Sequence, residues 1–499
     1  MELINQHSKN GIKYFWLGIG TLLFIFSNGR WTVPIAAWLA PVFLIGFTQS
    51  QKPFKGLVLL FIIFFLSTMV MLYGIVPNSL GFLTYILIFY YSLLWFLPYL
   101  ADRLLVNKVN GFKSTLIFPL TAVVVEYINT LIYGSWSATA YTQAGNLPLL
   151  QIMSVTGMWG ITFLVLWFGS TMNWVFKNGL LSPKTWKYFR IYLIILSAVF
   201  LFGGLRIAFY KSDLPTVQIA SFTPKKQIKD YYHEMDSLGF SSSMQMAIED
   251  RKSFRKLLFK MHENMFEQTR KEIKNGASLV LWPEGTTRVV EEDESEFLLR
   301  AILIAKSENA NILLAYLVVP KKNPKKLGEN KCVLIDSTGQ IRWKYLKSHP
   351  VPGSSDKAGY GHVPIADLSF ARVGSVICYD MDFTSLIHQA GRKKADIMLV
   401  PAWDWKAIDP LHTIMATFRA IENGFSLVRQ TGEGLSIAVN PIGKTLSSMD
   451  YFTAKNQEMT VQVPTKRIFT VYSCIGDLFA WLCIAGFVYF ILLALRPTN

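Results

Sequence analysis

The feature that most constrains the fold of this chain is a series of long apolar segments separated by short basic loops. The segments are Ile12–Ser27, Val33–Phe47, Leu57–Val76, Leu80–Leu100, Ser114–Tyr133, Met153–Phe176, Ile191–Tyr210 and Leu478–Leu495. A helix that crosses a bilayer needs about 20 apolar residues, and most of these segments approach that length. The sequence therefore predicts a membrane α-helical bundle of about eight spans, seven before a long polar segment and one after it.

The composition agrees with a membrane protein that carries one polar domain. Hydrophobic residues make up 52% of the chain and charged residues 16%, whereas soluble globular proteins have about 25% charged residues. An ordinary cytosolic enzyme, a disordered chain and a collagen-like chain are therefore excluded. The net charge of +16 does not indicate a nucleic-acid partner, because much of it flanks apolar segments, where attraction to anionic lipids explains it.

The cysteines and histidines show no ligand or disulfide pattern. The four cysteines form no CxxC pair, and the seven histidines form no HExxH motif or paired Cys/His spacing. Four cysteines in a chain of 499 residues do not make a disulfide framework. We therefore expect no metal and no cofactor.

The distribution of Lys and Arg predicts the orientation in the membrane. Eleven positive residues flank one side of the first seven spans, and the alternate short loops contain only Arg30. Because positive residues are retained in the cytoplasm, the N-terminus is expected to be cytoplasmic. The predicted organisation is a seven-span region over residues 1–211, an extracytoplasmic domain over 212–470 and a last transmembrane helix over 471–499. This corresponds to a multi-pass protein of the bacterial cytoplasmic membrane.

One carboxylate, Glu126, falls inside the fifth predicted span. Charged groups inside a membrane are costly and are often functional. Pairing with another group within the helical bundle explains this residue equally well, so we assign it no role.

The polar segment alternates short β-rich apolar runs with helical stretches. The predicted strands are TVQIASF, ASLVLWP, NILLAYLVV, KCVLIDS, QIRWKYL, ARVGSVICY, ADIMLVPA, SLVRQTG and LSIAVNP, and the predicted helices are Met244–Asn275, Glu294–Ser307 and His412–Asn423. Paired strands separated by turns are mixed with strand–helix units, which favours an α+β layered sandwich over a pure doubly wound sheet.

Three polar residues each follow an apolar strand, where catalytic groups often gather at a sheet edge. They are Glu284 after SLVLWP, Lys347 after QIRWKYL and Cys378 after RVGSVI. A thiolate is a strong nucleophile, a carboxylate can accept the thiol proton, and an ammonium group can stabilise a tetrahedral oxyanion. Taken singly, however, these residues also fit a turn acid, a surface lysine and a buried strand cysteine.

The motifs around these residues resemble a known superfamily. WPEGTTR, KYLKSHPVP and VICYD, in this order, are similar to the three catalytic motifs of the nitrilase (carbon–nitrogen hydrolase) superfamily. With seven spans before and one after, the chain resembles its membrane-bound branch, the bacterial apolipoprotein N-acyltransferases. PLLQIMSVTGMWGITFLV, FRAIENGFSLVRQTGEGLSIAVNPIG and TVYSCIGD resemble further segments of that family. The resemblance implies a nitrilase-like αββα sandwich and a Glu–Lys–Cys triad.

The resemblance also implies a role for each residue. Glu284 would be the general base, Lys347 would stabilise the intermediate, and Cys378 would be the nucleophile. Tyr379 and Asp380 would lie at the oxyanion and substrate-binding positions, where Asp380 replaces the usual glutamate.

The chain departs from the family pattern at two places. Ser355 falls where the family has a second glutamate, with Asp356 beside it, and PAWDW (Pro401–Trp405) replaces a serine–asparagine–aspartate–alanine–tryptophan stretch. These departures leave the triad unchanged but put the identity of the substrate in question.

Three functional readings follow. The first is an N-acyltransferase that moves an acyl chain from a phospholipid, through a cysteine thioester, to the N-terminal amine of a lipid-modified cysteine of a lipoprotein. The second is a membrane-bound amidohydrolase, or an acyltransferase acting on a different amine. The third, a non-catalytic membrane protein or a transporter, is disfavoured because we find no repeated halves. We expect a membrane-embedded monomer.

Overall fold

The computed structural model describes residues 2–76, 81–321 and 328–496, with side chains from residue 11 onward. It divides the chain into two compact units. One contains Met1–Tyr210 together with Ile475–Asn499, and the other contains Lys211–Cys474.

The first unit is helical. Its long helices are α1 (Glu2–Ile25), α2 (Pro34–Ser50), α3 (Pro53–Met71), α4 (Leu83–Leu105), α5 (Ile117–Tyr133), α8 (Trp159–Asn178), α9 (Pro183–Ala208) and α17 (Leu478–Leu495), and the short α6 (Leu147–Leu150) and α7 (Met153–Thr156) precede α8. Among the described residues, 6 helices are long and apolar enough to cross a membrane by length and composition, and α1 and α2 contribute shorter apolar stretches. This confirms the predicted membrane helical bundle, although the predicted start of the fourth span, Leu80, lies outside the described residues.

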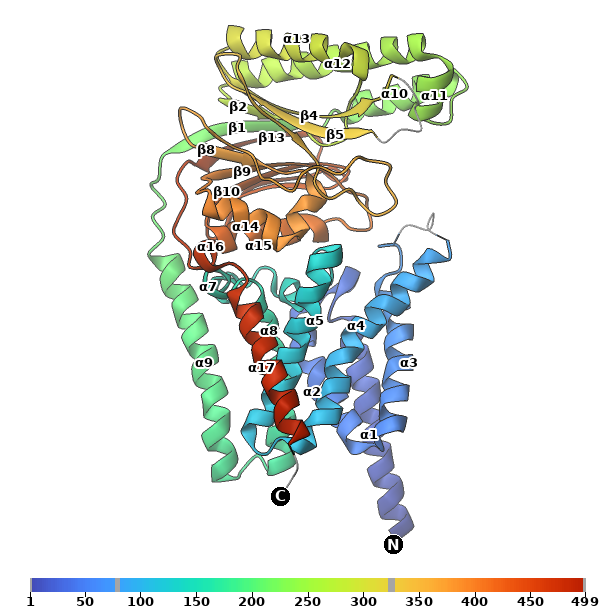
Figure 1. The fold of residues 1–499 in the computed structure, drawn as a ribbon, viewed down its shortest axis with the longest axis vertical. Helices are drawn as coiled ribbons and strands as arrows, with labels where there is room; N and C mark the ends of the chain where they lie inside the picture. Colours follow the sequence, from blue (N-terminus) through green and yellow to red (C-terminus); the bar gives the residue numbers. More distant parts are fainter. Residues whose placement is uncertain (1, 77–80, 322–327, 497–499) are drawn as a thin grey trace. The chain divides into compact units, whose positions relative to one another are not determined.

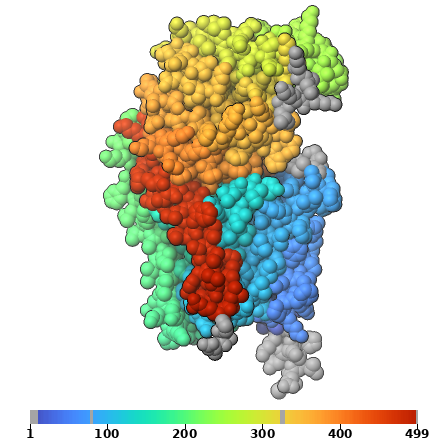
Figure 2. Space-filling model, viewed as in Figure 1, coloured from blue at the N-terminus to red at the C-terminus, as the bar shows by residue number. Residues whose placement is uncertain are grey.

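The last helix packs within this unit although it follows the other helices by several hundred residues. The rings of Tyr127 on α5 and Trp481 on α17 meet edge to face at 5.7 Å between centroids. Trp159 Nε1 donates a hydrogen bond of 2.7 Å to Asp477, 318 residues later. Figures 1 and 2 show α17, in red, beside α5. The two parts of the chain that flank the second unit thus fold together.

The second unit contains two sheets. The first is a 7-stranded sheet with the order β13-β1-β2-β4-β5-β6, and β3 pairs with β4 off this path. Its strands are β1 (Thr216–Phe222), β2 (Leu279–Leu281), β3 (Arg288–Val290), β4 (Asn311–Val319), β5 (Glu329–Ile335), β6 (Ile341–Leu346) and β13 (Glu458–Pro464). The second is a 6-stranded sheet with the order β12-β11-β10-β9-β8-β7. Its strands are β7 (Ile365–Asp367), β8 (Arg372–Ser375), β9 (Ile397–Trp403), β10 (Ser426–Gly432), β11 (Leu435–Val439) and β12 (Thr445–Asp450).

Helices cover the outer face of each sheet, so the unit has four layers in the order αββα (Figure 1). The first sheet is covered by α12 (Arg251–Lys274) and α13 (Glu294–Ser307), and the second by α14 (Thr384–Arg392) and α15 (Leu411–Asn423). The remaining helices are α10 (Lys225–Ser237), α11 (Ser243–Glu249) and α16 (Tyr472–Ile475). This confirms the predicted sandwich.

One predicted helix is divided in the structure. The sequence predicts a single helix over Met244–Asn275, but the structure has α11 and α12 separated at Asp250. The Asp250 side chain accepts a hydrogen bond of 3.0 Å from the backbone N–H of Ser253. Aspartate favours this N-cap geometry over a helix interior, which explains the break.

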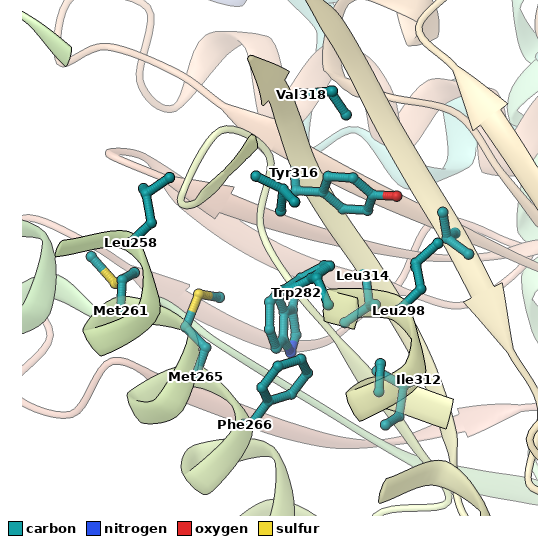
Figure 3. Packing of buried hydrophobic residues seen from close by; sticks show 14 of the residues in the cluster. Leu258, Met261, Met265, Phe266, Trp282, Leu298, Ile312, Leu314, Tyr316 and Val318 are labelled. Atoms are coloured by element: carbon teal, nitrogen blue, oxygen red, sulfur yellow. The ribbon is translucent and has the colours of Figure 1, made fainter. Parts of the chain in front are cut away.

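The apolar runs of the sheets alternate between two buried layers, because successive strand side chains point to opposite faces. On β2, Leu279 and Leu281 face the core between the sheets, whereas Val280 and the following Trp282 face the helical layer. Figure 3 shows the cluster between the first sheet and its helices, in which Trp282 packs with Phe266 and Met265 from α12. Both faces are buried, so these strands read as continuous apolar runs.

The strand directions bring two of the candidate residues to one edge. β2 runs parallel to β4, β5 runs antiparallel to β4, and β6 runs antiparallel to β5. The carboxyl ends of β2 and β6 therefore lie at the same edge of the first sheet. Glu284 follows β2 and Lys347 follows β6, so the topology itself accounts for their meeting.

Candidate active site

Glu284 lies in the turn that follows β2, and its side chain is buried. Its Oε1 accepts hydrogen bonds of 2.7 Å from both Lys347 Nζ and Asn330 Nδ2. Its Oε2 accepts a hydrogen bond of 3.0 Å from the backbone N–H of Trp403. The carboxylate is thus held in one orientation by groups from three other segments.

Lys347 is the first residue after β6, and its side chain is only 3% exposed. Burial by itself lowers the pKa of this ammonium group, but the nearby charges of Glu284 and Cys378 outweigh burial and raise the pKa above its ordinary value. Lys347 therefore stays protonated at neutral pH. It serves as a fixed positive charge and cannot be the base.

Cys378 is the first residue of a short 3₁₀ turn, Cys378–Asp382. Two residues connect this turn to β8 of the second sheet. Its backbone has φ = 48°, in the left-handed region that residues other than glycine rarely adopt. Backbone strain of this kind is common at active sites. Its thiol is buried and donates a hydrogen bond of 3.6 Å to the backbone carbonyl of Trp403.

The surroundings of Cys378 keep its thiol neutral at rest. Burial raises the pKa of the thiol, and the negative charge of Glu284 raises it further, while Lys347 and a hydrogen bond with His412 lower it. Transfer of the thiol proton to Glu284 would remove that negative charge. The arrangement thus suits a nucleophile that is activated by a neighbouring base.

The main chain of Trp403 links Glu284 to Cys378. Its N–H donates a hydrogen bond to the Glu284 carboxylate, and its carbonyl accepts one from the Cys378 thiol. Trp403 lies at the end of β9, inside the Pro401–Trp405 stretch that departs from the family pattern. A Cβ added at Gly432 would clash with the Trp403 ring, so glycine is required on the neighbouring strand. The departing segment is therefore part of the site.

Asp380 connects the 3₁₀ turn Cys378–Asp382, here called the nucleophile turn, to the loop that follows Lys347. Its carboxylate accepts hydrogen bonds from Tyr345 OH at 2.8 Å, from the backbone N–H of His349 at 2.7 Å and from that of Ile377 at 3.1 Å. Tyr379 is 8% exposed and its ring meets that of Phe383 edge to face. A direct contact of Tyr379 or Asp380 with substrate stays a prediction, but Asp380 clearly positions the two loops.

At the second departure from the family pattern, Ser355 is exposed and Asp356 is half-buried. Asp356 accepts a hydrogen bond of 3.4 Å from Asn330 Nδ2, the same group that donates to Glu284. Burial raises the pKa of Asp356. Asp356 is therefore the acidic side chain that approaches the site from this loop.

The structure adds a network that the sequence analysis did not identify. His412 Nδ1 lies 2.7 Å from Asp404 Oδ1, and Arg429 donates hydrogen bonds of 2.8 and 2.9 Å to the two oxygens of Asp404. A ring nitrogen of His412, Asp404 and Cys378 Sγ lie within 4.8 Å of one another. These are donor types that can bind zinc, but the Arg429 charge on both Asp404 oxygens opposes a bound cation.

In the membrane-spanning unit, Glu126 is paired within its own unit. Its Oε1 accepts hydrogen bonds from the backbone N–H of Thr139 at 3.0 Å and from the Thr139 hydroxyl at 2.6 Å. Its Oε2 accepts one of 2.8 Å from the Thr162 hydroxyl. Of the two readings of this residue, the structure favours pairing inside the bundle.

Each of the two units contains a region that matches a known protein family. Residues 242–467 match the family model of the carbon–nitrogen hydrolases. Residues 20–171 match that of the apolipoprotein N-acyltransferase N-terminal domain. The chain belongs to the apolipoprotein N-acyltransferase family of the carbon–nitrogen hydrolase superfamily.

Similar curated proteins carry the same family name. An apolipoprotein N-acyltransferase of Geobacter metallireducens is 22% identical over 485 residues, which cover 91% of this chain and 87% of that protein. One of Rickettsia typhi is 23% identical over 367 residues, 68% of each chain. Together with the apolar helices, these matches identify a bacterial membrane protein and an enzyme, which excludes the non-catalytic reading.

Among solved structures, an amidase of the nitrilase superfamily from Nesterenkonia AN1 is similar to part of this chain. It has 18% sequence identity and a TM-score of 0.38, over 51% of this chain and 94% of the amidase.

Proposed function

We propose that this protein moves an acyl chain from a membrane phospholipid, through a thioester on Cys378, to the N-terminal amine of a lipid-modified cysteine of a lipoprotein. The observation that carries this proposal is the buried Glu284–Lys347 pair, 2.7 Å apart, which the Trp403 main chain links to Cys378. The name of the relatives supports the acceptor.

In the first half-reaction, Glu284 takes the Cys378 proton and the thiolate attacks the ester carbonyl of the phospholipid. Lys347 and the backbone N–H of Tyr379 stabilise the oxyanion. The C–O bond breaks, the proton on Glu284 moves to the departing alcohol oxygen, and a lysophospholipid leaves. A thioester on Cys378 remains.

In the second half-reaction, the acceptor amine attacks the thioester and gives its proton to Glu284. The C–S bond breaks, the amide leaves, and Glu284 returns the proton to the Cys378 sulfur. Two half-reactions let one small site serve the lipid ester and the amine in turn. The raised pKa of Lys347 keeps its charge available for the oxyanion in both.

We further propose that residues 1–211 and 471–499 lie in the cytoplasmic membrane and that residues 212–470 form the catalytic domain outside the cytoplasm. The one-sided distribution of Lys and Arg supports this orientation. The apolar helices α9 and α17 lie on either side of the catalytic unit in the sequence, so both of its ends are anchored.

The acceptor is tested with purified protein in detergent, a phospholipid and a synthetic diacylated lipopeptide. The peptide should gain one acyl chain on its N-terminal amine by mass spectrometry. The same peptide with an acetylated N-terminus should gain none. Release of free fatty acid without amide formation would instead support the amidohydrolase reading.

The orientation is tested with one introduced cysteine at a time in a variant that lacks the exposed Cys474, and the label is located on the introduced cysteine by mass spectrometry of the peptides. Lys256→Cys on α12 and Lys184→Cys on α9 both replace exposed residues. In intact cells with a permeabilised outer layer, a membrane-impermeant maleimide should label the first variant. It should label the second only after lysis. The reverse pattern would contradict the orientation and, with it, the lipoprotein acceptor.

A further inference from the structure

His412 occupies a fully enclosed position between two carboxylates. Its Nδ1 lies 2.7 Å from Asp404 Oδ1, and its Nε2 lies 3.3 Å from Asp382 Oδ1. Its side chain is 4% exposed, and those of Asp404 and Asp382 are at most 1% exposed. A contact of 2.7 Å between a ring nitrogen and a carboxylate oxygen requires a proton between them. Nδ1 is therefore protonated.

The second ring nitrogen decides the charge of His412. The groups that face the ring are Asp382 and Cys378 on the nucleophile turn, Asp404 after β9, and Arg429 on β10, which lies 3.1 Å from Nδ1. Arg429 is already engaged by both oxygens of Asp404. Burial lowers the pKa of His412, but the two carboxylates raise it well above its ordinary value. His412 is thus an imidazolium at neutral pH.

This cation lies next to the reacting sulfur. Cys378 Sγ is within 4.8 Å of a His412 ring nitrogen. Nδ1 faces Asp404 and Nε2 faces Asp382, so the ring acts on a thiolate through its positive charge. The positive charge of Lys347 also interacts electrostatically with Cys378, but its ammonium group donates a hydrogen bond to Glu284.

We propose that His412, positioned by Asp404 and Arg429, is a fourth catalytic residue, whose imidazolium stabilises the Cys378 thiolate each time it forms. The thiol proton still goes to Glu284, and His412 keeps both of its own protons throughout. His412 thereby serves both half-reactions, because the thiolate is the attacking group in the first and the leaving group in the second. This inference rests on the proposed role of Cys378 as nucleophile.

The test measures the rate at which iodoacetamide, an uncharged probe, alkylates Cys378 as a function of pH, by mass spectrometry of the peptide. In full-length His412→Gln, the midpoint of the profile should move up by about one pH unit, and the rate at neutral pH should fall about tenfold. The control His233→Gln changes an exposed histidine on α10 and should react like the parent. A folded His412→Gln protein with the parent's profile would overturn the inference.

A second variant guards against misfolding of the first. His412→Asn keeps a hydrogen-bond donor toward Asp404 and should show the same upward shift. Independently, Glu284→Gln leaves two cations near Sγ, so Cys378 should then titrate below the ordinary thiol value of about 8.5. A midpoint at or above that value would overturn the inference even if neither His412 variant folds. A parent in which Cys378 does not react at all would instead contradict the proposed nucleophile.

Discussion

Glu284→Gln should lower the rate of acyl transfer by about three orders of magnitude or more, because members of a catalytic triad act as a unit. The carboxylate accepts three hydrogen bonds, from Lys347, Asn330 and the Trp403 N–H. A glutamine has one acceptor oxygen, so it cannot satisfy all three, and it cannot take the thiol proton. The measurement is the amide yield on the diacylated lipopeptide. Near-normal transfer would remove Glu284 from the role of base.

The burial of the ion pair calls for a second variant in this experiment. The Lys347 and Glu284 side chains are 3% and 6% exposed. Removing one partner of a buried pair typically destabilises a protein by about 3–5 kcal/mol, because the other charge is left buried. The double variant Glu284→Gln/Lys347→Met removes both charges. It should melt closer to the parent than Glu284→Gln does, yet it should be equally inactive.

A matched control is Glu294→Gln on α13. Glu294 also accepts a hydrogen bond from a lysine, Lys331, at 3.0 Å, but that pair lies on the helical side of the first sheet. This variant should retain the acyl-transfer rate of the parent. If it lost activity as completely as Glu284→Gln, the loss would reflect damage to the fold and not chemistry.

Much of the fold can be predicted from sequence because hydrophobic patterns report burial directly. NILLAYLVV and SLVRQTG correspond to β4 and β10 over their full lengths, since both faces of these central strands are buried. The short strands β3 and β7, each of 3 residues, lack such a pattern and were not predicted. The same is true of β12, which has exposed residues on both faces.

The candidate site was only partly predictable. Glu284, Lys347 and Cys378 each follow an apolar strand, and this local signal is visible in the sequence. Asn330 and His412 have no such signal, because their partners come from distant segments. Asn330, for example, donates to Glu284 across 46 residues. The one hint was the unusual PAWDW stretch, which supplies Trp403 and Asp404 to the site.

The second large effect concerns the nucleophile. Cys378→Ala should show no acyl transfer, because no other group in the proposed mechanism can carry the acyl chain. Cys332 is a suitable control thiol, since it is fully buried in β5 and burial raises its pKa far above the ordinary range. Its thiol lies 3.5 Å from the Ser375 hydroxyl, a group that has no part in the proposed mechanism. Cys332→Ala should therefore react like the parent.

The most direct test of the account is to incubate the purified protein with phospholipid alone and to measure the masses of its peptides by mass spectrometry. The peptide containing Cys378 should gain the mass of one acyl chain, and neutral hydroxylamine should remove that mass, as expected for a thioester. Cys378→Ala should show no adduct, and Cys332→Ala should show the same adduct as the parent. An adduct on Cys332 or full transfer activity in Cys378→Ala would contradict the proposed mechanism.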